Sequence, residues 1–154
     1  MKNRLFLREF LMLCLLLIVL SCSSEDAAMV DNSAEIEQIK INANSGSWSI
    51  TSYIDSGKNE TNNYTGYIFT FSAGGELTAS NSINTINGTW SVTDESSSDD
   101  NSNDIDFNIF FSTPPNFEEL SDDWDVVSTS NSKIELIDIS GGNGGTDTLT
   151  FEKN

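Results

Sequence analysis

Apolar and polar residues alternate along most of the chain from Gly46 onwards. Between Tyr67 and Ser72, aromatic residues occupy every second position, with Ile, Thr and Ser between them. This period of two is typical of a β-strand with one buried face. The pattern predicts eight strands, near residues 46–51, 67–72, 77–79, 86–92, 105–111, 124–129, 133–139 and 146–153.

Short turns connect most of these strands. Gly74-Gly75, Asn131-Ser132 and the glycine-rich run 141–145 are composed of residues that form hairpin turns. Each strand has one apolar face, and no helix of crossover length separates the strands. The chain is therefore predicted to be all-β, an eight-stranded antiparallel up-and-down barrel. A two-sheet sandwich is the competing architecture.

Two short helices are expected beside these strands. The first precedes strand 1, with Asn32 as its cap, Glu35 three places on, and Ile36 and Ile39 as an apolar stripe. The second lies between strands 5 and 6.

Proline defines where this second helix begins. Pro114-Pro115 end strand 5, because proline cannot donate a hydrogen bond to the ladder, and Asn116 is the expected helix cap. Phe117 and Leu120 would then point the same way and plug one end of the barrel. The alternative is an exposed ridge that binds a partner.

The first 21 residues have a different character. Lys2, Arg4 and Arg8 precede an apolar run from Leu11 to Leu20, which is the order of a secretory signal and too short to span a bilayer. Val19-Leu20-Ser21-Cys22 resembles the lipobox of bacterial lipoproteins. That resemblance implies cleavage before Cys22, whose side chain is then acylated with fatty acids such as palmitate.

The residues after Cys22 refine the expected location. Ser23-Ser24-Glu25-Asp26 resembles the acidic signal that sends lipoproteins to the outer cell face in some Gram-negative bacteria. The chain would then comprise a signal peptide at 1–21, an acidic tether at 22–33 and the barrel at 34–154, lipid-anchored in the outer membrane and facing the exterior. An ordinary secreted protein cleaved at Ala27-Ala28 is the alternative.

Charge narrows the range of partners. Removal of the leader takes three basic residues and Glu9, so four lysines and 23 acids remain, a net charge of −19. Such a charge repels nucleic acids and anionic lipid head groups. Membrane attachment would therefore come from the acyl chains on Cys22. No protein partner is indicated.

Missing residue types narrow the chemistry. The chain has no His, and the part after the leader has no Arg and no Cys except Cys22. These absences exclude a Ser-His-Asp triad, a His zinc site and His-ligated haem. Paired carboxylates could in principle hydrolyse glycosides, but these acids occupy loops and outward strand positions. We expect a non-catalytic protein without a cofactor.

Gly46-Ser47-Trp48, at the start of strand 1 and just after a short helix, matches the Gly-x-Trp signature of lipocalins. Residues 34–154 resemble the lipocalin-like domains of small bacterial surface lipoproteins. The resemblance implies that Trp48 lies at the closed end of the barrel with a basic residue across it, and Lys153 is the candidate. Gly88-Thr89-Trp90 repeats the pattern 42 residues later.

Lipocalin-like proteins often hold an apolar ligand inside the barrel. The loop 56–64 would lie over the open mouth, either as a lid that contributes Tyr64 or as a solvated polar loop. Without Arg or an inward Lys, a carboxylate ligand is too costly to desolvate, so a neutral apolar small molecule is expected. Alternatively the aromatic residues fill the barrel, leaving a structural or partner-binding module. The predicted lining is Trp48, Ile50, Tyr64, Tyr67, Phe69, Phe71, Trp90, Phe107, Ile109, Phe111 and Phe151.

The densest acidic stretch runs from Asp94 to Asp104. Asp99, Asn101, Asn103 and Asp104 carry the hard oxygen ligands that Ca²⁺ prefers, although the spacing is not that of an EF-hand. A mobile, solvated hairpin loop is the alternative.

Overall fold

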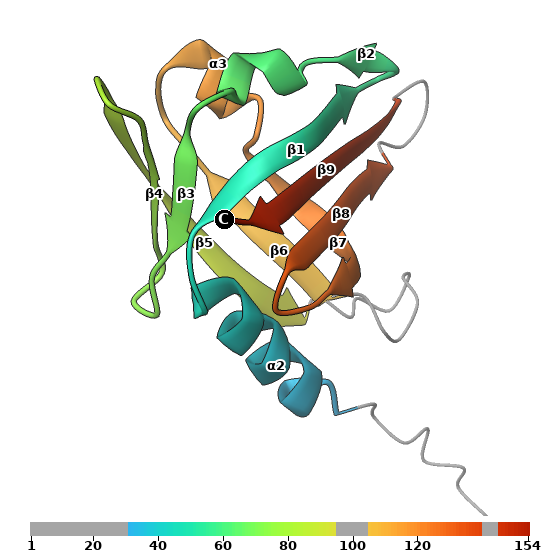
Figure 1. Cartoon of the computed structure of the whole chain (residues 1–154). Helices are drawn as coiled ribbons and strands as arrows, with labels where there is room; N and C mark the ends of the chain where they lie inside the picture. Colours follow the sequence, from blue (N-terminus) through green and yellow to red (C-terminus); the bar gives the residue numbers. More distant parts are fainter. Residues whose placement is uncertain (1–30, 95–104, 140–144) are drawn as a thin grey trace, which may run out of the picture.

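The computed structural model describes residues 31–94, 105–139 and 145–154 (Figure 1). Cys22 and the four candidate calcium ligands at 99–104 lie outside these ranges. The elements are α2 (Ser33–Asn44), β1 (Trp48–Asp55), β2 (Lys58–Asn59), the 3-10 helix η1 (Thr61–Tyr64), β3 (Ile68–Phe71), β4 (Glu76–Ser80), β5 (Thr85–Asp94), β6 (Ile105–Phe110), α3 (Pro115–Glu118), β7 (Asp122–Thr129), β8 (Lys133–Ile139) and β9 (Thr146–Lys153).

The strands form a closed antiparallel barrel. β3 to β9 pair in chain order, and β1 pairs with both β3 and β9, so the first and last full strands meet. The predicted up-and-down barrel is confirmed, and the sandwich alternative is wrong. All eight predicted strands are present, with ends that differ from the predicted limits by no more than a few residues.

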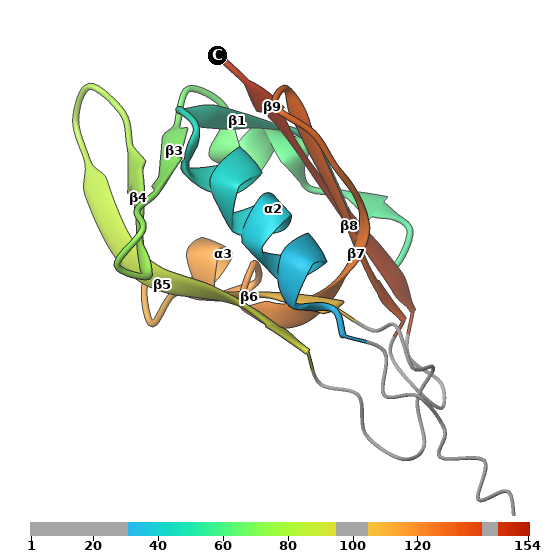
Figure 2. The ribbon, with the colours of Figure 1, turned by 90° about the horizontal axis from the view of Figure 1, so that it is seen from below.

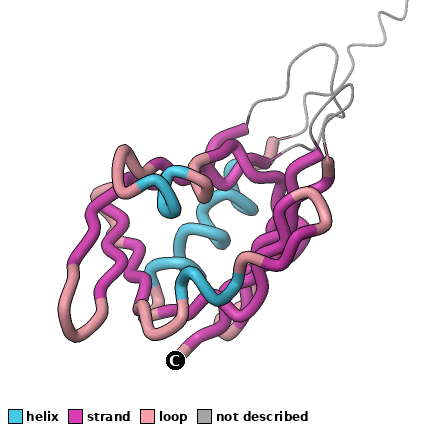
Figure 3. The backbone as a smooth tube through the Cα atoms, turned by 90° about the horizontal axis from the view of Figure 1, so that it is seen from above, coloured by secondary structure: helices cyan, strands magenta, loops and turns pink. Residues whose placement is uncertain are grey.

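The two helices lie at opposite ends of the barrel (Figures 1 and 2). α2 covers one end, where it buries Ile39 and Ala43. The indole Nε1 of Trp48 donates a hydrogen bond of 2.8 Å to the carbonyl oxygen of Ala43, which fixes the helix against the start of β1. α3 and η1 lie at the other end (Figure 3).

Neither predicted helix cap forms as expected. Asn32 precedes α2 but makes no side-chain capping bond; the backbone N–H of Ser33 instead donates to Asp31 at 3.1 Å. α3 begins at Pro115 with Pro114 as its cap residue, two residues earlier than the expected cap at Asn116 implies. Proline at the first helical position loses no helical hydrogen bond, which explains the earlier start.

The sequence pattern missed the hairpin that follows β1. β1 continues to Asp55, and a two-residue turn at Ser56 and Gly57 leads into β2. The turn residues have φ values of +47° and +85°, as a type I′ turn requires. The strand was predicted to end near Thr51 because a register shift between Ile50 and Ser52 breaks the alternation.

The two Gly-x-Trp segments differ in position and in what their glycines contact. Gly46 precedes β1, which begins at Trp48, whereas Gly88 and Trp90 both lie within β5. A Cβ on Gly46 would lie 2.6 Å from Cε of Lys153, whose Nζ lies 5.9 Å from the ring centre of Trp48. The contact that the resemblance implied for Lys153 is thus present. A Cβ on Gly88 would lie 2.4 Å from the backbone oxygen of Phe110.

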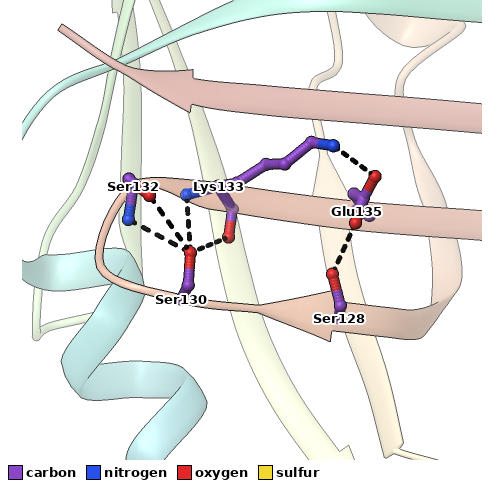
Figure 4. A network of polar contacts seen from close by, with 5 residues as sticks. All are labelled: Ser128, Ser130, Ser132, Lys133 and Glu135. Carbon is purple, nitrogen blue, oxygen red and sulfur yellow. Dashed lines mark hydrogen bonds and ion pairs between the residues drawn. The ribbon is translucent and has the colours of Figure 1, made fainter.

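A polar network stabilises the hairpin between β7 and β8 (Figure 4). The Ser130 hydroxyl accepts hydrogen bonds from the backbone N–H groups of Ser132 and Lys133, at 3.2 and 3.0 Å. The Lys133 ammonium pairs with Glu135, whose other oxygen accepts a bond from Ser128. The hydroxyl of Ser130 therefore stabilises the predicted turn at 131–132.

The two glycines should respond differently to alanine. Gly88→Ala meets backbone and the Phe111 ring, so we expect a loss of about 1–3 kcal/mol in the free energy of unfolding. Gly46→Ala meets only the flexible end of Lys153 and should cost less than about 1 kcal/mol. Urea unfolding of both variants measures the difference; equal losses would contradict the assigned contacts.

Candidate functional site

The structure places the predicted lining residues inside one hydrophobic core. Tyr67 is partly buried, and the other ten are buried. Three further aromatic residues share this core besides the predicted lining: Tyr53, Phe117 and Trp124. Phe117 was predicted as part of the plug, whereas Tyr53 was missed because of the register shift in β1.

The aromatic rings of the core pack on one another. Phe71 lies centrally, with its ring centre 5.2 Å from Trp90, 5.3 Å from Phe107 and 5.4 Å from Phe151. These contacts are edge-to-face, the arrangement that aromatic pairs prefer. Trp90 also stacks on Phe107, at 5.4 Å. Rings from β3, β5, β6 and β9 thus meet across the interior of the barrel.

α3 closes the barrel end opposite α2. Phe117 is 1% exposed, and its ring centre lies 5.0–5.5 Å from those of Tyr64, Tyr67 and Phe111. Leu120, just after the helix, is fully buried. The structure thus favours the predicted plug over a partner-binding ridge.

Two tyrosine hydroxyls hold this plug. Tyr64 donates a hydrogen bond of 2.6 Å to the carbonyl oxygen of Asn116, and Tyr53 donates one of 2.7 Å to that of Glu119. Burial raises the pKa of both tyrosines well above the usual range, and nearby acids including Glu119 and Glu60 raise it further. Both hydroxyls therefore remain protonated donors. Tyr64 lies under α3, so the loop 56–64 contributes to the closed end.

A cluster of five acids flanks this closed end. Glu118 and Glu119 lie at the end of α3, and Asp122, Asp123 and Asp125 lie on β7. Among the described residues, no three acids are placed to hold a metal ion together. Calcium binding at 99–104 stays a prediction, because those residues lie outside the described ranges.

The pKa of Asp122, in this cluster, is clearly raised. Burial is the main cause, and a hydrogen bond with the side chain of Asp123 and the charges of Asp138 and Asp123 add to it. Together they raise the pKa of Asp122 from 3.8 to about 6. Among the described residues, no lysine forms an ion pair with it.

Comparison with known proteins gives a similarity to a solved structure. No protein-family model matches the chain, and no curated protein matches it. Among solved structures, the chain is similar to a DUF4847 family protein from Bacteroides vulgatus, with 21% identity, 73% of this chain and 94% of that chain covered, and a TM-score of 0.46. Within the described residues, no helix has the length and apolar composition needed to cross a membrane.

Asp122 should make stability depend on pH. Its folded pKa lies above the ordinary 3.8, so the folded state binds more protons than the unfolded state between pH 3.8 and about 6. Asp122 therefore destabilises the fold above that interval and has no effect below it. At pH values above 6, we therefore expect Asp122→Asn to raise the midpoint temperature of thermal unfolding. This gain in midpoint temperature should shrink as the pH falls.

The matched control is Glu152→Gln, which removes an equal charge from the exposed end of β9. Thermal unfolding of both variants at several pH values measures the effect. The same pH-independent gain in both variants would show that only overall charge is involved.

Proposed function

We propose that the protein is a non-catalytic, lipid-anchored module of the bacterial outer membrane, exposed to the exterior, whose barrel is a filled scaffold that acts through its outer surface. The leader and Cys22 support the anchor, and Ser23 to Asp26 support the outward location. The barrel fold supports the proposal that the protein is a lipocalin-like module. A ligand carrier would act through the barrel interior, whereas this module would act through its outer surface.

The observation that carries this proposal is the ring packing around Phe71. Its contacts with Trp90, Phe107 and Phe151 occupy the space that a ligand would need. Protein interiors of this kind are packed as densely as organic crystals, so a ligand could enter only by displacing rings. α2 and α3 cover the two ends. Of the two functions that the sequence left open, packing favours the filled module over the carrier of a neutral apolar molecule.

Binding of a neutral apolar fluorophore tests the filled interior. We expect no saturable one-to-one binding of N-phenyl-1-naphthylamine by the folded protein, because the ligand would have to displace the packed rings around Phe71. The control variant is Phe110→Ala, because Phe110 is 57% exposed on the outer face of β6 and could adsorb the fluorophore at the surface. One-to-one binding that persists in Phe110→Ala would restore the ligand-carrier function.

Cys22→Ser tests the anchor. We expect it to abolish labelling with radioactive palmitate and to release the protein from the membrane fraction, because the acyl acceptor is lost. Cys14→Ser is the matched control, since Cys14 lies within the leader and should be removed with it. Normal acylation of Cys22→Ser would contradict the lipoprotein assignment.

A further inference from the structure

The hairpin of β4 and β5 stands out from the barrel wall (Figures 2 and 3). The first part of β5, Thr85–Gly88, pairs only with β4, and pairing with β6 begins at Thr89. Within the described part of the chain, one edge of Thr85–Gly88 therefore has no neighbouring strand. An unpaired edge is a template for another strand.

The hydrogen-bond pattern shows which backbone groups face this edge. The N–H of Trp90 donates to the carbonyl oxygen of Gly75 at 2.9 Å, on the β4 side. Because bonded positions alternate along an antiparallel strand, Asn87 and Thr85 direct their N–H and C=O groups away from β4. Both residues are exposed. These groups form no turn or side-chain hydrogen bond with a described residue, so two donors and two acceptors are presented to solvent.

A groove adjoins this edge where β6 ends. It has a volume of about 620 Å³ and is lined by residues that include Thr89, Phe110, Ser121 and Asp122. Phe110 is opposite Thr89 in the ladder and is 57% exposed. Thr89, the residue that follows the free edge in β5, thus lines the groove together with the exposed ring of Phe110.

The charges around the groove favour a cationic occupant. From Leu77 to Thr93 the chain has no charged residue, so an approaching backbone meets no carboxylate along the hairpin. Asp122, on the groove wall, is partly desolvated beside other acids, and an ammonium or guanidinium group would relieve that repulsion. The net negative charge of the whole chain would also attract a basic partner.

We propose that an extended, basic segment of a partner protein binds here, adding a strand to the free edge at Thr85–Gly88, covering Phe110 and placing a Lys or Arg at Asp122. Strand addition uses main-chain bonds for affinity and side-chain pockets for specificity. The inference rests on the proposed function, because it supplies the kind of partner that the outer surface would take.

A second copy of this chain fits the groove less well. After the leader the chain has no Arg, and its four lysines include Lys58 and Lys133, which pair with Glu60 and Glu135. Lys153 lies against Trp48. Two strongly acidic copies would also repel each other.

The test uses the acylated protein in nanodiscs and a random peptide library displayed on phage. We expect the enriched peptides to contain a Lys or Arg next to apolar residues. Synthetic copies should lose affinity by about tenfold on Asp122→Asn, the effect of losing one charged hydrogen-bonded partner. Asp122→Asn is expected to be at least as stable as the wild type at neutral pH, so this loss would not reflect unfolding.

Asn87→Pro tests the strand edge. It removes the N–H that faces away from β4 and leaves the β4–β5 bonds, since proline is tolerated on a free edge. We expect it to weaken binding by about tenfold or more.

Phe110→Ser tests the contribution of the exposed ring and should weaken peptide binding. Val127→Ser is its control, because Val127 is 60% exposed on β7 and its substitution should leave binding unchanged.

Three results would overturn the proposal: no peptides enriched over empty nanodiscs, enriched peptides without basic residues, or binding that is indifferent to Asn87→Pro and Asp122→Asn. A dimer in sedimentation experiments that Asn87→Pro dissociates would assign the edge to a second copy instead. None of these results affects palmitate labelling or fluorophore binding, so the proposed function would be judged separately.

Discussion

Six residue pairs between β1 and β9, from Trp48 with Lys153 to Ile54 with Thr148, join the first and last full strands and close the barrel. Closure fixes the width of the interior, because strand number and tilt set the diameter of a barrel. An eight-stranded barrel is just wide enough for side chains to fill. In this chain the buried positions are occupied by Phe, Trp and Tyr together with Ile, Leu, Val and Ala, so closure and sequence together produce a packed interior.

The two ends of the barrel are closed by different physical means. At the α2 end, Trp48 bonds to the helix and Lys153 packs over the indole, so the contacts come from residues close to the barrel's first and last strands. At the α3 end, Phe117 inserts among aromatic rings and two tyrosines donate to helix carbonyls. With both ends covered, new main-chain and apolar contacts have to form on the outer surface, where the free strand edge of β5 and the groove beside Phe110 lie.

The strands could be predicted from the sequence because each has one buried face, which gives a period of two that does not depend on distant residues. The plug could also be anticipated, since Phe117 and Leu120 have the spacing of one helix face. Burial of Tyr53 could not, because a register shift breaks the alternation in β1. Nor could the free edge of Thr85–Gly88, which depends on where β6 stops relative to β5, a matter of register between strands rather than of local pattern.

The central claim is that the barrel is a scaffold with a filled interior rather than a container. Native mass spectrometry of the protein, isolated gently from the cells that produce it, tests this claim most directly, because a resident ligand would survive such isolation. The account predicts the mass of the covalent polypeptide alone, with no non-covalent addition that disappears on unfolding. A stoichiometric small molecule that is released only when the barrel unfolds would contradict it.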